Sequence, residues 1–234
     1  MKIVVFGDIH GRLVWDDIIN KEKPDKVIFL GDYVSTHDNI PAEQQLANLE
    51  DIINYKEANP ESVIMLRGNH DTQHLGYHWA ECSGFDRNVC KYMGSSDFRI
   101  RFLDATKWIH VEEIGGEKYI FAHAGVSKEW LNYTNIKFEE INELGPDERF
   151  GFTSDNWYDG YGTSKTQSCV WIRPATLVEY AVDGYNQVVG HTPTDNIRMV
   201  QMENGNCLWL CDSLGYNNYL VIENNIFESR HYDE

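Results

Sequence analysis

The stretch Gly7-Asp8-Ile9-His10-Gly11 joins a short apolar run to a segment with helical periodicity. The run before it, from Lys2 to Phe6, is rich in β-branched residues and predicts a buried strand. After it, apolar residues recur with helical spacing between Arg12 and Glu22. The segment is therefore expected to fold as a strand, a tight turn and a helix. Glycines at both ends of the turn allow the backbone to bend sharply there.

The turn carries two side chains that can bind a cation. Asp8 and His10 are separated by one residue, and side chains alternate along extended backbone, so we expect both to point to the same side. A carboxylate oxygen and an imidazole nitrogen together suit a divalent metal ion. Taken alone, the motif is also compatible with a structural hydrogen bond between Asp8 and His10.

Similar polar residues follow four further apolar runs. They are Asp32 after residues 25–30, Asn69 and His70 after residues 62–66, His123 after residues 118–122, and His191 after residues 187–189. The first three runs alternate with helical patterns, which predicts a parallel sheet with right-handed crossovers. Ligands of such sheets collect at the carboxyl ends of the strands. These side chains form a ligand set for two divalent ions that share one bridging carboxylate.

The remaining sequence predicts one domain over residues 1–234. Residues 72–107 and 138–166 break the strand and helix pattern, and we expect them to be insertions or loops near the site. Strand-like runs at 198–202 and 207–211 flank Asn204-Gly205, a dipeptide typical of hairpin turns. A last run at 219–222 completes the sheets.

Composition limits the possible partners. The chain has 20 Lys and Arg against 37 Asp and Glu, a formal charge of −17, and this argues against nucleic acid because phosphate neutralisation requires clustered cations. No apolar run is long enough for a membrane helix, so no membrane association is expected. The five cysteines show no metal-finger spacing. Because the first strand begins at once, we expect no signal peptide and a cytoplasmic protein. The oligomeric state is not predicted.

The ordered motifs resemble those of the calcineurin-like metallophosphoesterases, and among these the bacterial and phage relatives of the Ser/Thr phosphoprotein phosphatases. The resembling stretches are Gly7-Asp8-Ile9-His10-Gly11, Gly31-Asp32-Tyr33-Val34, Leu66-Arg67-Gly68-Asn69-His70-Asp71, His123-Ala124-Gly125 and Gly190-His191-Thr192-Pro193. The resemblance implies an α/β fold with four layers, α/β/β/α, and two mixed sheets. It also implies two metal sites and a separate acid. The implied ligands are Asp8, His10 and Asp32 for one ion and Asp32, Asn69, His123 and His191 for the other, with His70 as the acid.

The expected activity is hydrolysis of a phosphate monoester by attack of a water bound to two metal ions. The substrate would be a protein phosphorylated on Ser, Thr or Tyr, or a small phosphorylated metabolite. Manganese is the first expectation for the metal, with iron and zinc as alternatives. Many phosphodiesterases of this superfamily have a second His at the position of Thr192, and its absence favours a monoesterase. The alternatives are a phosphodiesterase or dinucleoside polyphosphate hydrolase and, in another class, a metal-binding scaffold without catalysis.

Two features depart from the phosphatase pattern. Ser35-Thr36-His37 stands where the phosphatases usually have Asp-Arg-Gly, so the usual partner of the acid His and the usual phosphate-binding Arg are both missing. Asp71 is one candidate to orient His70. Arg173 is a candidate phosphate ligand, since its guanidinium can bind two oxygens at once, although a surface ion pair is the simpler reading. Arg67 is expected either to bind phosphate or to brace the loop that contains Asn69.

Overall fold

The computed structural model describes every residue except 37, 155, 156 and 234, so the prediction for His37 lies outside the described residues. Among the described residues, the strands form two larger sheets and one short hairpin. The first sheet has the order β13-β12-β1-β2-β3-β4. Its strands are β1 (Lys2–Phe6), β2 (Lys26–Phe29), β3 (Val63–Leu66), β4 (Thr106–Lys107), β12 (Asn218–Glu223) and β13 (Ile226–His231). The second has the order β10-β11-β9-β6-β5. Its strands are β5 (Ile109–Ile114), β6 (Glu117–Ala122), β9 (Asn186–Val189), β10 (Arg198–Gln201) and β11 (Cys207–Leu210).

Both sheets are mixed. Strands β1 to β4 are parallel to their neighbours, as the alternation of strands and helices predicts, whereas β12 and β13 pair antiparallel. In the second sheet, β9 is parallel to β6 and β11, and β5 and β10 pair antiparallel at the edges. The antiparallel pairing of β10 with β11 confirms the hairpin predicted at Asn204-Gly205.

The layers follow from the two-residue period of the strands. In β1, Ile3 and Val5 belong to the core between the two sheets, together with Phe121 of β6. The alternate residues Val4 and Phe6 face the helices on the other side of the first sheet. Because successive side chains point to opposite faces, one uniformly apolar strand fills two cores. This explains why apolar and polar residues do not alternate in the run before Gly7.

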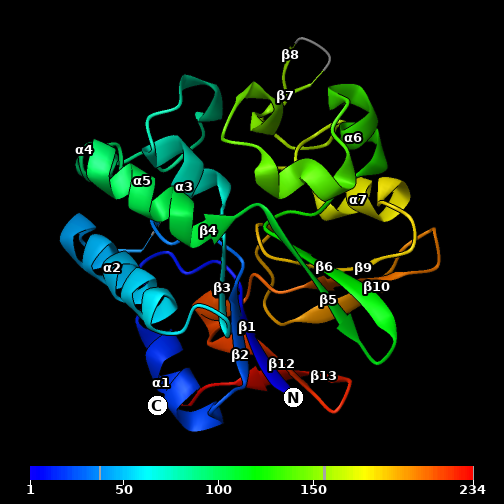
Figure 1. Ribbon diagram of the computed structural model, residues 1–234, viewed down its shortest axis with the longest axis horizontal. Helices are drawn as coiled ribbons and strands as arrows, with labels where there is room; N and C mark the ends of the chain where they lie inside the picture. Colours follow the sequence, from blue (N-terminus) through cyan, green and yellow to red (C-terminus); the bar gives the residue numbers. More distant parts are fainter. Residues whose placement is uncertain (37, 155–156, 234) are drawn as a thin grey trace.

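Helices cover the outer face of each sheet, as Figure 1 shows. On the first sheet lie α1 (Val14–Glu22), α2 (Ala42–Ala58) and α5 (Ser96–Ala105), and near them α3 (Asn69–His74) and α4 (Arg87–Met93). On the second sheet lie α6 (Lys128–Thr134) and α7 (Pro174–Tyr180), which bury Trp130 and Leu177 against it. The α/β fold with two mixed sheets is thus confirmed.

The two segments without clear periodicity contain short elements. Residues 72–107 hold the end of α3, a 3₁₀ turn η1 (His78–Ala80), α4, α5 and β4. Residues 138–166 hold η2 (Phe138–Glu143), η3 (Glu148–Phe150) and the hairpin β7 (Thr153–Ser154) with β8 (Trp157–Tyr158). The 3₁₀ turn η4 (Leu214–Tyr216) precedes β12. Within the described part of the chain, no helix has the length and apolar character needed to cross a membrane.

Candidate metal centre

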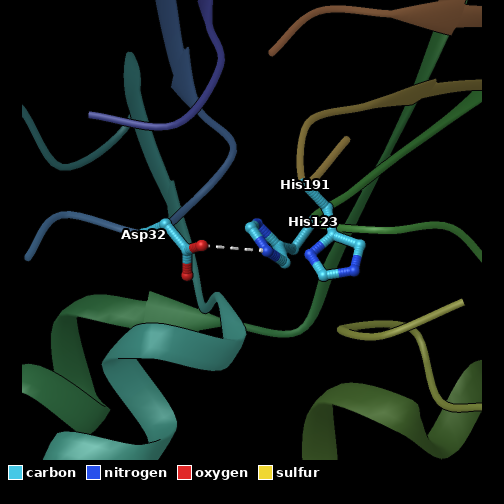
Figure 2. Close-up of side chains that lie close together, drawn as sticks. All are labelled: Asp32, His123 and His191. Carbon is cyan, nitrogen blue, oxygen red and sulfur yellow. Dashed lines mark ion pairs between the residues drawn. The ribbon is translucent and has the colours of Figure 1, made fainter. Parts of the chain in front are cut away.

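The loops that follow β1, β2, β6 and β9 bring their polar residues together between the two sheets. Two groups of potential ligand atoms result, and within each group all ligand atoms lie within 4.8 Å of one another. One group is Asp8, His10 and Asp32, and the other is Asp32, His123 and His191. Asp32 belongs to both groups. Figure 2 shows the ring of His123 directed at the Asp32 carboxylate, with His191 beside it.

Individual distances describe a tight cluster. Nε2 of His123 lies 3.4 Å from Oδ2 of Asp32 and 2.9 Å from Oδ1 of Asn69. Nε2 of His10 lies 3.8 Å from Oδ2 of Asp8. Asp8, Asp32, Asn69 and His123 are each at most 2% exposed. Buried carboxylate, amide and imidazole groups at these separations are suited to divalent cations.

The orientation of the imidazoles provides a test of whether this site fits a metal. Each of three histidines directs one ring nitrogen at a backbone carbonyl, which can only accept a hydrogen bond. The contacts are Nδ1 of His10 to Val34 (3.1 Å), Nδ1 of His123 to Leu30 (2.9 Å) and Nε2 of His191 to Trp171 (3.2 Å). With the proton of the neutral ring on that nitrogen, the other nitrogen presents a lone pair to a cation. Metal-binding histidines have this arrangement, so the donor set fits.

The local backbone conformation differs from the one expected for Asp8 and His10. His10 has φ of 47°, in the left-handed region, so the two side chains do not converge through the alternation of an extended chain. Asp32 and His191 also have positive φ, 51° and 63°. Such conformations are costly for residues other than glycine and concentrate at functional sites. The turn directs His10 toward Asp8, and its N–H donates to the carbonyl of Asp32 at 2.7 Å.

Two glycines make room for the carboxylates. A Cβ atom on Gly68 would lie 2.0 Å from Oδ1 of Asp32, and one on Gly190 would lie 2.4 Å from Oδ1 of Asp8. Shortly after each glycine, a backbone N–H donates a hydrogen bond to the same carboxylate. The N–H of His70 donates to Asp32 (2.9 Å), and the N–H of His191 donates to Asp8 (2.8 Å). Each carboxylate thus has one oxygen fixed by the backbone of another motif.

The charges of the cluster also favour a cation. Burial, with Asp212 and Asp32 nearby, raises the pKa of Asp8 well above its usual value, and burial with Asp71 does the same for Asp32. Burial lowers the pKa of His123 to about 3, so this ring is neutral and able to bind metal. Several buried carboxylates can be ionised together only if cations compensate them, and a divalent ion supplies that charge.

Asp212 is a member of the cluster that the sequence analysis missed. It follows β11 and is 8% exposed, and burial raises its pKa to about 6. It contributes to the shift at Asp8 and lines a cavity of about 170 Å³ together with His10 and Arg12. The signal was present in the sequence, because Asp212 follows an apolar strand just as Asp8 and Asp32 do.

A profile of the calcineurin-like phosphoesterases matches residues 1–219. The chain belongs to this family. The family match and the two groups of candidate ligands agree in the residues they involve, since both groups lie within the matched range.

Sequence relatives of the chain include two Ser/Thr phosphatases. The serine/threonine-protein phosphatase 4 catalytic subunit of Kluyveromyces lactis is 26% identical over 156 residues, which cover 62% of this chain and 46% of that protein. Serine/threonine-protein phosphatase PP1-delta of Caenorhabditis elegans is 28% identical over 131 residues, which cover 53% and 39%. The chain thus matches less than half the length of these curated relatives.

Solved structures share the fold of this chain. A cold-active protein-tyrosine phosphatase of a psychrophilic Shewanella species superposes with a TM-score of 0.61 and 18% identity, covering 97% of this chain and 77% of that one. A protein serine/threonine phosphatase of Saccharomyces cerevisiae superposes with a TM-score of 0.60 and 16% identity, covering 100% and 81%. At these identities the likeness establishes the fold alone.

Asp71 is fully buried, and its carboxylate is bonded to backbone groups. Its oxygens accept hydrogen bonds from the N–H groups of Asp32 (2.8 Å), Tyr33 (2.9 Å) and Gly68 (2.9 Å). Asp71 therefore fixes the loop that presents Asp32. The hypothesis that it orients the ring of His70 is not supported by these contacts.

Arg67 also makes structural contacts. Its guanidinium donates to Oγ1 of Thr106 (2.8 Å), to the carbonyl of Thr106 (2.7 Å) and to the carbonyl of Leu103 (2.8 Å). It also stacks over the ring of Trp108, 4.7 Å from the centroid. Of the two roles considered from sequence, this geometry favours bracing of the loop over contact with phosphate.

Arg173 lies at the cluster. Its Nη1 donates to Oγ1 of Thr192 and to the carbonyl of His191, both at 3.1 Å. Burial lowers the pKa of Arg173, while Asp8, Asp212 and Asp32 oppose this shift as neighbouring negative charges. Thr192 thus holds an arginine beside the candidate ligands.

Proposed function

We propose that this protein is a phosphomonoesterase that uses two divalent cations. One would be held by Asp8, His10 and Asp32 and the other by Asp32, Asn69, His123 and His191. The observation that supports this proposal most directly is that Asp32 belongs to both ligand groups. A carboxylate has two oxygens and can bridge two cations, which a single imidazole cannot do.

Side chains of the protein would bind the phosphoryl group and protonate the leaving oxygen. When bound, the two cations would activate a water molecule as nucleophile and neutralise charge on the phosphoryl oxygens. Arg173, held by Thr192, would bind a phosphoryl oxygen with its charge-assisted donors. Nε2 of His70 lies 4.0 Å from Oδ2 of Asp32, at the edge of the cluster. From there it would donate a proton to the leaving oxygen, a contribution worth about 10²–10⁴-fold in rate.

The pairing of Thr192 with Arg173 favours a monoester over a diester. A monoester presents an additional anionic oxygen, which the guanidinium can bind, whereas a histidine at this position would add a ligand to the metal site. The relatives named Ser/Thr phosphatases support phosphoserine or phosphothreonine in a protein as the substrate, with a small phosphorylated metabolite as the alternative. We also propose manganese as the metal, and residues 1–234 as one metallophosphoesterase domain.

Hydrolysis of nitrophenyl esters tests the proposal. The metal-free protein, reloaded with Mn²⁺, is expected to hydrolyse p-nitrophenyl phosphate faster than bis-p-nitrophenyl phosphate, and Asp32→Asn should abolish both activities. Faster cleavage of the diester would assign the protein to the diesterases. Binding of two cations without turnover of either ester would identify a scaffold, and a folded protein that binds no cation would contradict the metal centre itself.

A further inference from the structure

The first sheet ends in a strand with an open edge. Strand β13 (Ile226–His231) is the outermost strand of this sheet and pairs on one side with β12, at the bottom of the view in Figure 1. Four of its six residues are exposed and none is buried. An open edge presents N–H and C=O groups that can bind a further strand. Which strand fits depends on the backbone groups and the charges that the edge presents.

The turn before β13 determines which of its backbone groups face outward. Asn224 and Asn225 join β12 to β13, and both have positive φ, 52° and 64°, as a two-residue type I′ turn requires. Glu223 and Ile226 flank the turn and therefore form a hydrogen-bonded pair, and such pairs alternate along an antiparallel ladder. The residues that direct their N–H and C=O groups away from β12 are thus Phe227, Ser229 and His231. Among the described residues, none of these outward groups has a backbone partner.

The side chains between the outward-facing residues carry opposite charges. Glu228 and Arg230 lie on the same face of β13, and Nε of Arg230 donates to Glu228 at 2.7 Å. Charged residues on an edge strand usually prevent pairing with another chain. A strand with one charge of each sign on either side of a central residue is an exception when it meets a copy of itself. Antiparallel pairing then sets each charge opposite its counterpart.

The charges select one register for such a pair. When two β13 strands pair antiparallel with Ser229 at the centre, Glu228 lies opposite Arg230 of the second copy, and Arg230 lies opposite Glu228. A centre at Glu228 or at Arg230 would instead set like charges against each other, which is destabilising. With Ser229 at the centre, the outward-facing residues also pair with one another, Ser229 with Ser229 and Phe227 with His231. The backbone bonds and the charges are therefore satisfied in the same arrangement.

Both charged groups retain capacity for this second partner. Within its own chain, Arg230 donates from Nη1 to Glu22 of α1 at 2.6 Å and from Nε to Glu228, which leaves further N–H groups of the guanidinium for another acceptor. The side chain of Glu228 is 56% exposed, so its carboxylate is accessible to a second cation. In the same register, Ile226, which is 67% exposed, lies opposite Tyr232 of the second copy.

We propose that β13 is an interface to a second copy of this chain, paired antiparallel about a two-fold axis at Ser229, so that the first sheets of two molecules form one continuous sheet. The partner is a second copy because the order of charges along β13 is complementary to itself. A two-fold interface uses the same patch on both molecules, as this register does. The interface involves none of the candidate metal ligands, so the inference is independent of the proposed function.

Sedimentation velocity of the full chain over a range of concentrations tests the association. We expect the wild type to form a reversible dimer. Glu228→Arg sets an arginine opposite Arg230, and Arg230→Glu sets a glutamate opposite Glu228, so each variant should raise the dimer dissociation constant by about 10-fold or more. An equal mixture of the two variants should restore association, because every arginine then faces a glutamate. A wild type that stays monomeric at every concentration, or a mixture that associates no better than either variant alone, would refute the inference.

A further variant separates the interface from folding, because Arg230→Glu also removes the ion pair with Glu22. Ser229→Pro removes an N–H that faces away from β12, a position at which an edge strand tolerates proline, and it should abolish the dimer while circular dichroism and thermal unfolding show a folded monomer. A folded Ser229→Pro variant that dimerises like the wild type would overturn the assignment of the interface to β13.

Glu179→Arg is the matched control for the charge variants. Glu179 is exposed on α7, and its replacement changes the net charge of the protein by the same amount as Glu228→Arg. The dimer dissociation constant should remain that of the wild type. If Glu179→Arg weakened the dimer as much as Glu228→Arg, net charge and not the register of β13 would govern association, and the inference would fail.

Discussion

Nε2 of His123 lies 3.4 Å from Oδ2 of Asp32, and both groups are almost completely buried. The bond from Nδ1 of His123 to the carbonyl of Leu30 places the lone pair on the nitrogen that faces the carboxylate. A neutral imidazole and a carboxylate that both present lone pairs repel each other unless a proton or a cation lies between them. A bound cation would interact favourably with both lone pairs, and this leads to the first prediction.

Asp32→Asn should lower the activity of the enzyme and raise the stability of the metal-free protein. Loss of a shared ligand is expected to lower kcat/KM by more than about 100-fold, because even residues that only support ligands cost about 10–100-fold. In the metal-free protein the same change should raise the free energy of unfolding at neutral pH. Burial and Asp71 raise the pKa of Asp32, so its ionised form opposes folding. Bound metal and denaturant unfolding in a chelator measure the two effects.

The sign of this effect gives a pH test. Because the folded-state pKa of Asp32 lies above its unfolded value, the difference between variant and wild type should be largest at neutral pH. It should vanish below the unfolded value, where both states are protonated. Asp51→Asn, on the exposed face of α2, is the control and should change neither quantity. A wild type more stable than Asp32→Asn without metal would contradict the argument.

His70→Asn should lower kcat by about 10²–10⁴-fold while the protein retains its full metal content. The expectation follows from the position of Nε2, 4.0 Å from Asp32 and at the edge of the ligand groups. Metal analysis after dialysis, together with turnover of phenyl phosphate, measures both quantities. Loss of one cation in the variant would make His70 a ligand and remove its assignment as the acid.

Arg173→Lys should weaken binding of inorganic phosphate, a competitive inhibitor, by about 10-fold, since hydrogen bonds to charged groups contribute about 1.5–3 kcal/mol and Lys lacks the planar fork. Thr192→Val should give a smaller loss in the same direction, because it removes the hydroxyl that holds the guanidinium at 3.1 Å. Inhibition constants in the metal-loaded enzyme test both variants. Unchanged phosphate affinity in Arg173→Lys would place Arg173 outside the phosphate site.

The stability of the protein should fall in mild acid through His110. Burial and Lys107, whose Nζ lies 3.0 Å from Nδ1, lower the pKa of His110 from 6.5 to about 4, while Glu112 at 2.9 Å opposes this shift. The unfolded chain therefore binds a proton at higher pH than the folded chain. Stability should decrease as the pH falls below the unfolded value, by about 2 kcal/mol near pH 5, and level off below the folded value.

His110→Gln should remove this part of the pH dependence. The amide can accept from Lys107 and donate to Glu112 without titrating. Denaturant unfolding between mildly acidic and neutral pH provides the comparison, and His231→Gln, at an exposed imidazole in β13, is the control. If wild type and His110→Gln lose stability in parallel, His110 is not the group responsible.

The sequence predicted those parts of the fold that depend on local pattern. The uniformly apolar runs that became β1, β2 and β3 had to be buried on both faces, and strands of this kind separated by helices pair in parallel. The polar residues directly after these strands, among them Asp8 and Asp32, could be recognised as candidate ligands because strand ends meet at one edge of a sheet.

Local pattern was insufficient where a side chain forms hydrogen bonds with backbone groups that are distant in the sequence. Asp71 could not be distinguished from a partner of His70, because only the folded chain places its carboxylate against the N–H groups of Asp32 and Tyr33. The turn at His10, with φ of 47°, also replaced the extended geometry inferred from spacing. Strand β13 was not predicted, because four of its six residues are exposed and none is buried, so its sequence shows little alternation of apolar and polar residues.

The sequence by itself determined which residues of this protein can serve as ligands and the order in which they occur, because strand-forming runs and the turns after them are local properties. Only the tertiary structure decided what those side chains contact. It placed one nitrogen of His123 against a carbonyl, bonded the guanidinium of Arg67 to the carbonyl of Leu103, and placed the amide of Gln73 near Nδ1 of His70. The physical reason is that a buried polar group must find its partner wherever the packed chain supplies one.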